Sequence, residues 1–204
     1  MEKIDLKKEL KEFYAPRPAG PRLIELPSFN YLSAEGQGDP NQSAEFKGAV
    51  EALFSLSYAL KFHLKKGPLG IDYAVMPLEG LWWAPDMTHF KERRDKSQWQ
   101  WRLLIHQPQW VDAEMVERLR GQVGAKKDLP WLSRLEFGPF AEGPCAQVLH
   151  QGPFDDEGPT ISRLHQFIAN QGKSLAGLHH EIYLSDIRRG NPANWKTLIR
   201  QPYT

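Results

Sequence analysis

The sequence predicts an α+β fold in which two βαββ repeats form one antiparallel sheet, with helices on one face and a ligand groove on the other. Three observations favour this arrangement. The chain has 204 residues, of which 41% are hydrophobic, and this is enough for a domain with a sizeable core. Each half shows the order strand, helix, strand, strand, with a period of about 110 residues. The segments that predict helices carry one apolar face each.

The first half is dominated by one long helix. Apolar residues recur every three or four positions from Ser43 to Lys66, and Gly67-Pro68 should end the helix. A second helix should begin near Asp112, a favourable capping residue. The expected elements are, in chain order, a helix over 1–14, a proline-rich linker over 15–27, a strand over 29–35, a helix over 43–66, strands over 72–83 and 98–107 with a charged loop over 86–97 between them, and a helix over 111–127.

The second half repeats this order with shorter elements. Its helix has apolar residues on one face and should end at Gly172. The expected elements are a strand over 143–152, a helix over 160–171, and strands over 179–185 and 195–201. We therefore divide the chain into an N-terminal helix and linker (1–27) and a single domain (28–204), in which repeat one spans about 28–127 and repeat two about 128–204.

Charge and composition exclude several classes of protein. Lysine and arginine number 26 against 25 acidic residues, so the basic excess of a nucleic-acid-binding protein is lacking. No apolar run reaches the length of a membrane span or a signal peptide. The single cysteine, Cys145, excludes an internal disulfide and a multi-cysteine metal site. We expect a cytoplasmic monomer without metal or cofactor.

The strand over 179–185 carries candidate functional residues. Side chains alternate across a strand, so Glu181 and Tyr183 share a face with His179, whereas Ile182 and Leu184 share the other face with His180. We expect the helices to cover Ile182 and Leu184, which leaves Glu181 and Tyr183 in the groove. A carboxylate among aromatic rings is partly desolvated and suits a general base or a counter-ion to a cation.

Tryptophan is concentrated in the first half. Five of the seven tryptophans lie between residues 82 and 110. They could belong to an ordinary core or form the walls of a pocket for a flat or cationic ligand.

Two stretches resemble a known family. The segment VLHQGPF, followed by TISRLHQFIANQGKSLAGLHHEIYLSD, is similar to the C-terminal half of the domain of the GyrI-like (gyrase-inhibitor-like) small-molecule-binding family. The run PLEGLWW at 77–83 resembles a stand-alone subgroup that keeps both repeats, so the resemblance covers about 28–204. It implies a tandem SHS2-like repeat around a concave groove. In multidrug-responsive relatives, a pocket glutamate on the strand that matches Glu181 neutralises lipophilic cations. Some stand-alone members resemble hydrolases that open the cyclopropane of DNA-alkylating compounds of the yatakemycin and CC-1065 type.

The first hypothesis is therefore a detoxifying hydrolase for a lipophilic aromatic small molecule. Glu181 would activate water and Tyr183 would hold that water or the ligand. The groove that holds the ligand would be lined by Glu79, Trp83, Trp101, Trp131 and Phe140, with Glu79 as the matching carboxylate of repeat one. The second hypothesis is a protein that binds or sequesters lipophilic cations without turnover. A third is a protein-binding role, such as protection of gyrase.

Overall fold

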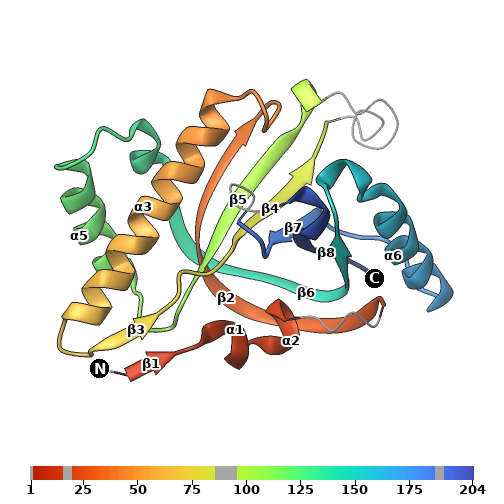
Figure 1. Cartoon of the computed structure of the whole chain (residues 1–204), viewed down its shortest axis with the longest axis horizontal. Helices are drawn as coiled ribbons and strands as arrows, with labels where there is room; N and C mark the ends of the chain where they lie inside the picture. The colour runs from red at the N-terminus through yellow and green to blue at the C-terminus, as the bar shows by residue number, and fades with distance from the viewer. Residues whose placement is uncertain (1, 16–19, 86–95, 187–190) are drawn as a thin grey trace. The chain divides into compact units, whose positions relative to one another are not determined.

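The structure is a computed structural model and describes residues 2–15, 20–85, 96–186 and 191–204. Its helices are α1 (Leu6–Glu9), α2 (Lys11–Tyr14), α3 (Ala44–Lys66), α5 (Ala113–Gly124) and α6 (Gly158–Asn170), with 3₁₀ turns η1 (Lys96–Gln98), η2 (Pro130–Arg134), η3 (Phe154–Asp156) and η4 (Pro192–Asn194). Its strands are β1 (Glu2–Ile4), β2 (Arg22–Gln37), β3 (Ile71–Tyr73), β4 (Leu78–Trp83), β5 (Gln100–Gln107), β6 (Glu136–Gln151), β7 (His179–Tyr183) and β8 (Lys196–Pro202) (Figure 1). Most of the charged loop predicted over 86–97, and residues 16–19 of the predicted linker, lie outside the described residues. None of the helices described is long and apolar enough to cross a membrane.

The α+β class is confirmed, but the prediction of one open sheet is wrong. Strands β2, β5, β4, β7, β8 and β6 hydrogen-bond in that order, and the order closes on itself as a barrel. The two strands that complete the ring, β2 and β6, are 16 residues long and extend well before the strands predicted there. A separate pair, β1 and β3, is parallel and aligns Lys3 with Asp72.

The chain forms two compact units. Unit 1 comprises Met1–Leu6, Phe29–Met76 and Trp82–Phe140, and unit 2 comprises Lys7–Ser28, Pro77–Leu81 and Ala141–Thr204. Strands β2, β4 and β6 each contribute residues to both units. The division of the chain into residues 1–27 and 28–204 stays a prediction.

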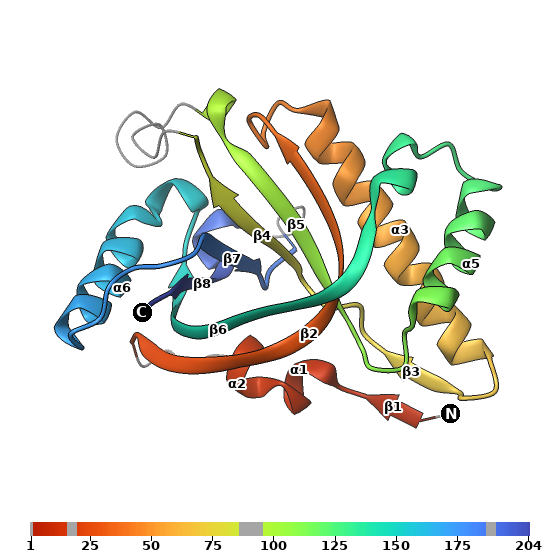
Figure 2. The same cartoon turned by 180° about the vertical axis from the view of Figure 1, so that it is seen from behind.

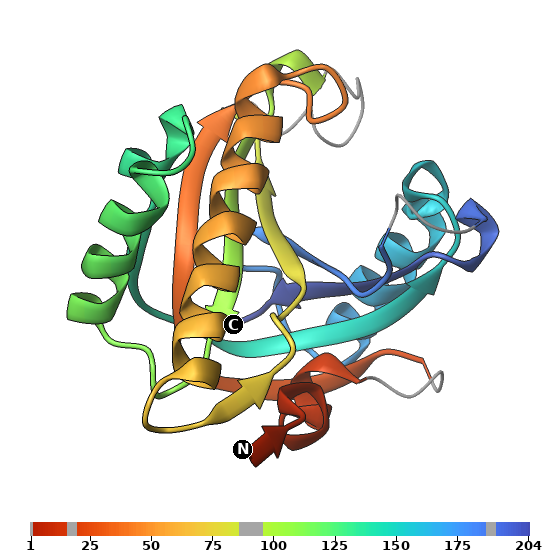
Figure 3. The same ribbon diagram turned by 60° about the vertical axis from the view of Figure 1, so that its left-hand side comes forward.

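In unit 1 the long helix α3 matches the prediction. Ser43 caps it, because the Ser43 hydroxyl accepts a hydrogen bond from the Phe46 N–H over 3.1 Å. At the other end the Gly67 N–H donates to the His63 carbonyl. Leu53 and Leu60 are completely buried, and Figure 3 shows α3 running alongside the strands of this unit. The helix thus provides much of the core of unit 1.

The predicted N-terminal helix is divided in the structure. Residues 2–4 form β1, and the rest forms two helices of four residues each, α1 and α2. The strand expected over 72–83 is likewise divided into β3 and β4. Segments this short depend on tertiary packing rather than on local propensity, so their limits are not visible in the sequence.

The core of unit 2 lies between α6 and the sheet. Leu164 and Ile168 of α6 pack against Val148 of β6 and Ile199 of β8 in one buried cluster, and Figure 2 shows α6 alongside β8. Cross-strand partners project to the same face of a sheet, and Val148 aligns with Ile199. This identifies the face of β6, β8 and β7 that α6 covers.

Candidate functional site

Glu181 and Tyr183 lie side by side on β7, as the alternation predicts. The Tyr183 hydroxyl donates a hydrogen bond to Glu181 Oε2 over 2.8 Å. The His179 Nε2 lies 2.9 Å from Glu181 Oε1 on the same face. Both oxygens of Glu181 are therefore held, and 15% of its side chain remains exposed.

The expected orientation of β7 is wrong. Glu181 aligns with Ile199, which packs under α6, so Glu181 and Tyr183 lie on the face that α6 covers. Ile182 points to the other face and is completely buried there as well. Because both faces of β7 are covered, the apolar residues on their own could not identify the helix side.

Aromatic rings surround the end of β7 beside Glu181. Phe154 of η3 lies 5.5 Å from Tyr183, edge to face, and 5.2 Å from Trp195, measured between ring centroids. The three rings are partly exposed. The Trp195 indole N–H is buried and has no hydrogen-bond partner among the described residues. We call Phe154, Tyr183 and Trp195 the aromatic group.

A second carboxyl group faces Glu181. Glu157, directly before α6, is only 4% exposed, and the two carboxyl groups share a hydrogen bond. Burial and the charge of Glu181 raise the pKa of Glu157 to about 9. Burial alone would raise the pKa of Glu181, but hydrogen bonds from His179, Tyr183 and Glu157 hold it below its ordinary value. At neutral pH, Glu157 is therefore protonated and Glu181 is ionised.

The opposite face of β7 carries a separate ionisable cluster. His180 lies between two carboxylates, with Nε2 3.0 Å from Glu79 Oε2 and Nδ1 2.9 Å from Glu142 Oε2. The Tyr14 hydroxyl donates to Glu79 Oε1 over 2.7 Å. Burial alone would lower the pKa of His180, but Glu142 and Glu79 raise it to about 9. We call Tyr14, Glu79, Glu142 and His180 the His180 cluster.

Arg200 connects this cluster to the N-terminal segment. Its guanidinium donates to Gln147 Oε1 over 3.1 Å and to the carbonyl of Phe13. Its positive charge also lowers the pKa of Glu142, although burial alone would raise that pKa. The cluster is thus closely balanced in charge, with two carboxylates against an imidazolium and a guanidinium.

Glu79, expected in the ligand lining as the matching carboxylate of repeat one, does not lie on the face of Glu181. It bonds to His180, and His180 and Glu181 are successive residues of one strand whose side chains point to opposite faces. The two carboxylates therefore serve different groups of residues.

The other expected ligand contacts lie in unit 1. Trp101 has no exposed surface and packs edge to face on Phe46, with ring centroids 5.3 Å apart. Trp131 is stacked on the Arg134 guanidinium. Trp83 donates to Gln100, and Phe140 packs on Tyr31, with ring centroids 6.1 Å apart. Trp101 and Trp131 thus serve the core of unit 1, and a ligand role for the four remains a prediction.

Phe154, Glu157 and Trp195 are not among the site residues predicted from the sequence. Trp195 could have been found, because residues 195, 197 and 199 share one face of the strand predicted over 195–201, and Ile199 aligns with Glu181. Phe154 belongs to the GPF run that carried the family resemblance. Glu157 had no local signal, since its role depends on contact with a strand more than twenty residues away.

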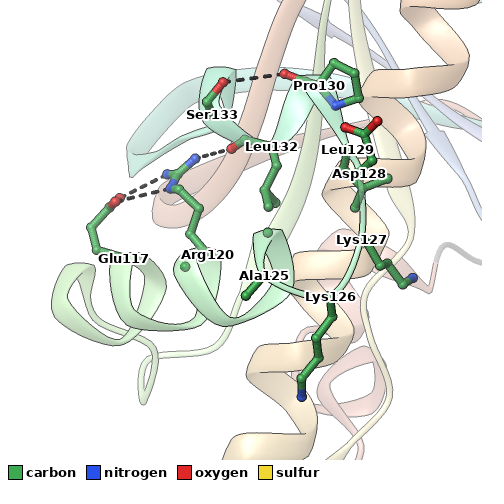
Figure 4. A pocket seen from close by; sticks show the side chains of 12 residues that line it. Glu117, Arg120, Ala125, Lys126, Lys127, Asp128, Leu129, Pro130, Leu132 and Ser133 are labelled. Atoms are coloured by element: carbon green, nitrogen blue, oxygen red, sulfur yellow. Dashed lines mark hydrogen bonds and ion pairs between the residues drawn. The ribbon is translucent and has the colours of Figure 1, made fainter.

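An open pocket of about 760 Å³ lies between α5 and η2 in unit 1 (Figure 4). Arg120 at its rim donates to Glu117 and to the carbonyl of Leu132, so its guanidinium is already engaged. Among the described residues no three His, Cys, Asp or Glu side chains could hold a metal ion together. We therefore assign the candidate site to the carboxyl pair and the aromatic group in unit 2.

Comparison with known proteins agrees with a small-molecule site. Residues 105–204 match the model of the GyrI-like small molecule binding domain. Two hydrolases from Listeria innocua are 36% identical to the chain, with TM-scores of 0.88 over all of both chains and 0.86 over 98% of this chain and all of the other. An uncharacterized conserved protein from Listeria innocua is also 36% identical, with a TM-score of 0.90 over 98% of this chain and all of the other. No curated protein matches the chain.

Proposed function

This chain belongs to the GyrI-like family of small-molecule-binding proteins, and we propose that it is a hydrolase that opens cyclopropane-bearing DNA-alkylating compounds by adding water. One observation carries the proposal. Glu181 is an ionised, partly exposed carboxylate whose two oxygens are fixed by His179 and Tyr183 beside aromatic rings. The Listeria hydrolases of similar sequence support the reaction class.

The aromatic group suits a flat, apolar electrophile. Rings stack on planar ligands, and the partly exposed faces of Phe154 and Trp195 lie beside the carboxylate. A strained ring conjugated to a carbonyl reacts readily once a nucleophile is positioned, so positioning and one base supply the acceleration it needs.

Glu181 acts as the general base in this reaction. It accepts a proton from a bound water as the water oxygen bonds to the strained ring carbon. The carbon–carbon bond of the cyclopropane breaks, and its electron pair moves through the conjugated system to the carbonyl oxygen. Tyr183 and His179 act as positioning residues because they fix the carboxylate through hydrogen bonds.

The test is turnover by purified protein at a small molar fraction of the alkylating compound. Chromatography with mass detection should show gain of one water. Glu181→Gln should reduce the rate by about 10²–10⁴-fold, the usual contribution of a general base. Glu51→Gln on the exposed surface of α3 is the matched control and should keep full activity. Full turnover by Glu181→Gln would refute the role of Glu181 as the base.

A binding protein for lipophilic cations is the second candidate, because an ionised carboxylate beside aromatic rings also suits a cation. In that case the wild-type protein would bind the alkylating compound and return it intact. Glu181→Gln would then weaken the binding of cations and spare neutral ligands. These results separate the two candidates without any further variant.

A further inference from the structure

Glu157 is held in place by backbone and side-chain contacts. Its N–H donates to the Phe154 carbonyl over 3.1 Å, and its carbonyl accepts from the Ile161 N–H over 2.9 Å. These bonds fix the backbone of Glu157 between η3 and α6. The side chain is buried, and its Oε1 has no hydrogen-bond donor among the described residues, although its carboxyl group faces Glu181. A buried carboxyl oxygen without a donor costs free energy, so its presence calls for an explanation.

One proton is shared by two carboxyl groups, and the surroundings determine its position. His179 and Tyr183 bond to Glu181 and favour its ionised form. Glu157 faces the negative charges of Glu181 and Asp155, so its ionised form is disfavoured. Thr197 acts in the other direction, because its hydrogen bond to Glu157 favours the ionised form, but it carries no charge. Two close carboxyl groups with different surroundings divide the roles of acid and base.

We infer that Glu157 is the proton donor of the reaction proposed above, delivering its proton to the substrate oxygen that gains the electron pair as the ring opens. This inference rests on the proposed hydrolase function. In the complete step, water loses a proton to Glu181 and its oxygen bonds to the ring carbon. The carbon–carbon bond breaks toward the carbonyl, and the carbonyl oxygen takes the proton of Glu157. The product is a neutral alcohol and phenol, and no co-reactant is needed.

The pair also resets itself. After the reaction Glu181 holds a proton and Glu157 is ionised, which is the reverse of the resting arrangement. The two carboxyl groups face each other, so the proton passes directly back to Glu157. The favoured substrates are therefore neutral electrophiles whose opening places negative charge on a conjugated oxygen.

The inference is tested by comparing the hydrolysis rates of the wild-type protein and Glu157→Gln. Glutamine keeps the size and neutrality of the resting acid but cannot donate a proton. The wild-type rate should fall above about pH 9 as Glu157 ionises, and the variant should lack this alkaline decrease. With two spiro-cyclopropane dienones, the variant should lose at least tenfold more rate on the one whose product phenol is the more basic. Equal losses and an unchanged alkaline decrease would overturn the role of Glu157 while leaving Glu181 as the base. No turnover by the wild-type protein would overturn both proposals.

Infrared spectroscopy provides a test without substrate. The wild-type protein at neutral pH should show the carbonyl band of a buried protonated carboxyl group, and Glu157→Gln should lack it. The exposed control Glu51→Gln should retain the band. If the wild-type protein shows this band and Glu157→Gln shows it too, the inference is overturned, whether or not that variant remains active.

Discussion

Replacing Glu157 with glutamine should stabilise the protein at neutral and alkaline pH. In the folded protein, burial and the neighbouring charge of Glu181 keep the carboxyl group of Glu157 protonated. The unfolded chain releases that proton near the ordinary glutamate pKa. The folded state thus binds one proton more than the unfolded state, and holding it costs free energy as the pH rises. Glutamine is neutral at every pH and avoids this cost.

The size of the effect follows from the two pKa values. The pKa of Glu157 is raised from 4.5 to about 9. The cost in free energy of unfolding accumulates from pH 4.5 upward, at about 1.36 kcal/mol for each pH unit. At pH 7 this is 7 − 4.5, or 2.5 pH units, which gives about 3 kcal/mol. Below pH 4.5 both states are protonated and no cost exists. Between pH 4.5 and 9 the free energy of unfolding of the wild-type protein falls as pH rises.

Urea denaturation at pH 5, 7 and 8.5 should measure this difference. The stability of Glu157→Gln relative to wild type should increase by roughly 1.36 kcal/mol for each pH unit. A hydrogen bond that glutamine fails to make changes the stability difference by an amount that does not depend on pH. The test is therefore the slope of the stability difference against pH. A stability difference that is constant from pH 5 to 8.5 would refute the assignment of the proton to Glu157.

Three further predictions concern stability. The pKa of His180 is raised from 6.5 to about 9, so its stabilising contribution should be complete below pH 6.5 and be lost as the pH rises through 9. His180→Leu should lower the free energy of unfolding by about 3–5 kcal/mol in urea denaturation, because it leaves buried carboxylates without their cation. Tyr14→Phe should lower the free energy of unfolding by about 1.5–3 kcal/mol, since the buried carboxylate of Glu79 loses one of its two hydrogen-bond partners. A loss below 0.5 kcal/mol, on the order of a neutral surface change, would contradict this. Gly36→Ala should lower the free energy of unfolding by about 1–3 kcal/mol, because a Cβ at this position collides with the Trp101 ring. Gly121→Ala on helix α5 has open space for the Cβ and should stabilise the protein by about 0.5–1 kcal/mol in thermal unfolding.

The sequence predicts those parts of the fold that local pattern determines. Helices α3 and α6 are found within two residues of their limits because apolar periodicity and end signals coincide there. Strands β2 and β6 are not, because Pro27 in one and Pro139 and Pro144 in the other are usually strand breakers. The closure of the sheet depends on the pairing of these long strands with distant partners. Such pairing leaves no trace in any short window of sequence.

The site was predictable only along a single strand. Alternation on β7 correctly grouped Glu181 with Tyr183 and separated both from His180. It could not tell which face α6 would cover, because the apolar Ile182 is buried on the other side. Among the clustered tryptophans, Trp101 fills the core of unit 1, and the ligand role of these residues stays a prediction. Phe154 and Glu157 enter the site through the turn before α6, which a reading of strands alone does not consider.

Charge balance distinguishes the two ionisable groups that β7 carries on its two faces. Around His180, two carboxylates meet an imidazolium and a guanidinium, and Tyr14 donates to Glu79, so the charges of the group balance without a ligand, although Nη1 of Arg200 has no hydrogen-bond partner among the described residues. Around Glu181, a second carboxyl group is buried nearby with an unpartnered oxygen, and it remains neutral only by keeping its proton. The first arrangement stabilises the fold and resists change. The second arrangement keeps a proton at a cost in free energy, and this imbalance favours that face of β7 as the candidate site.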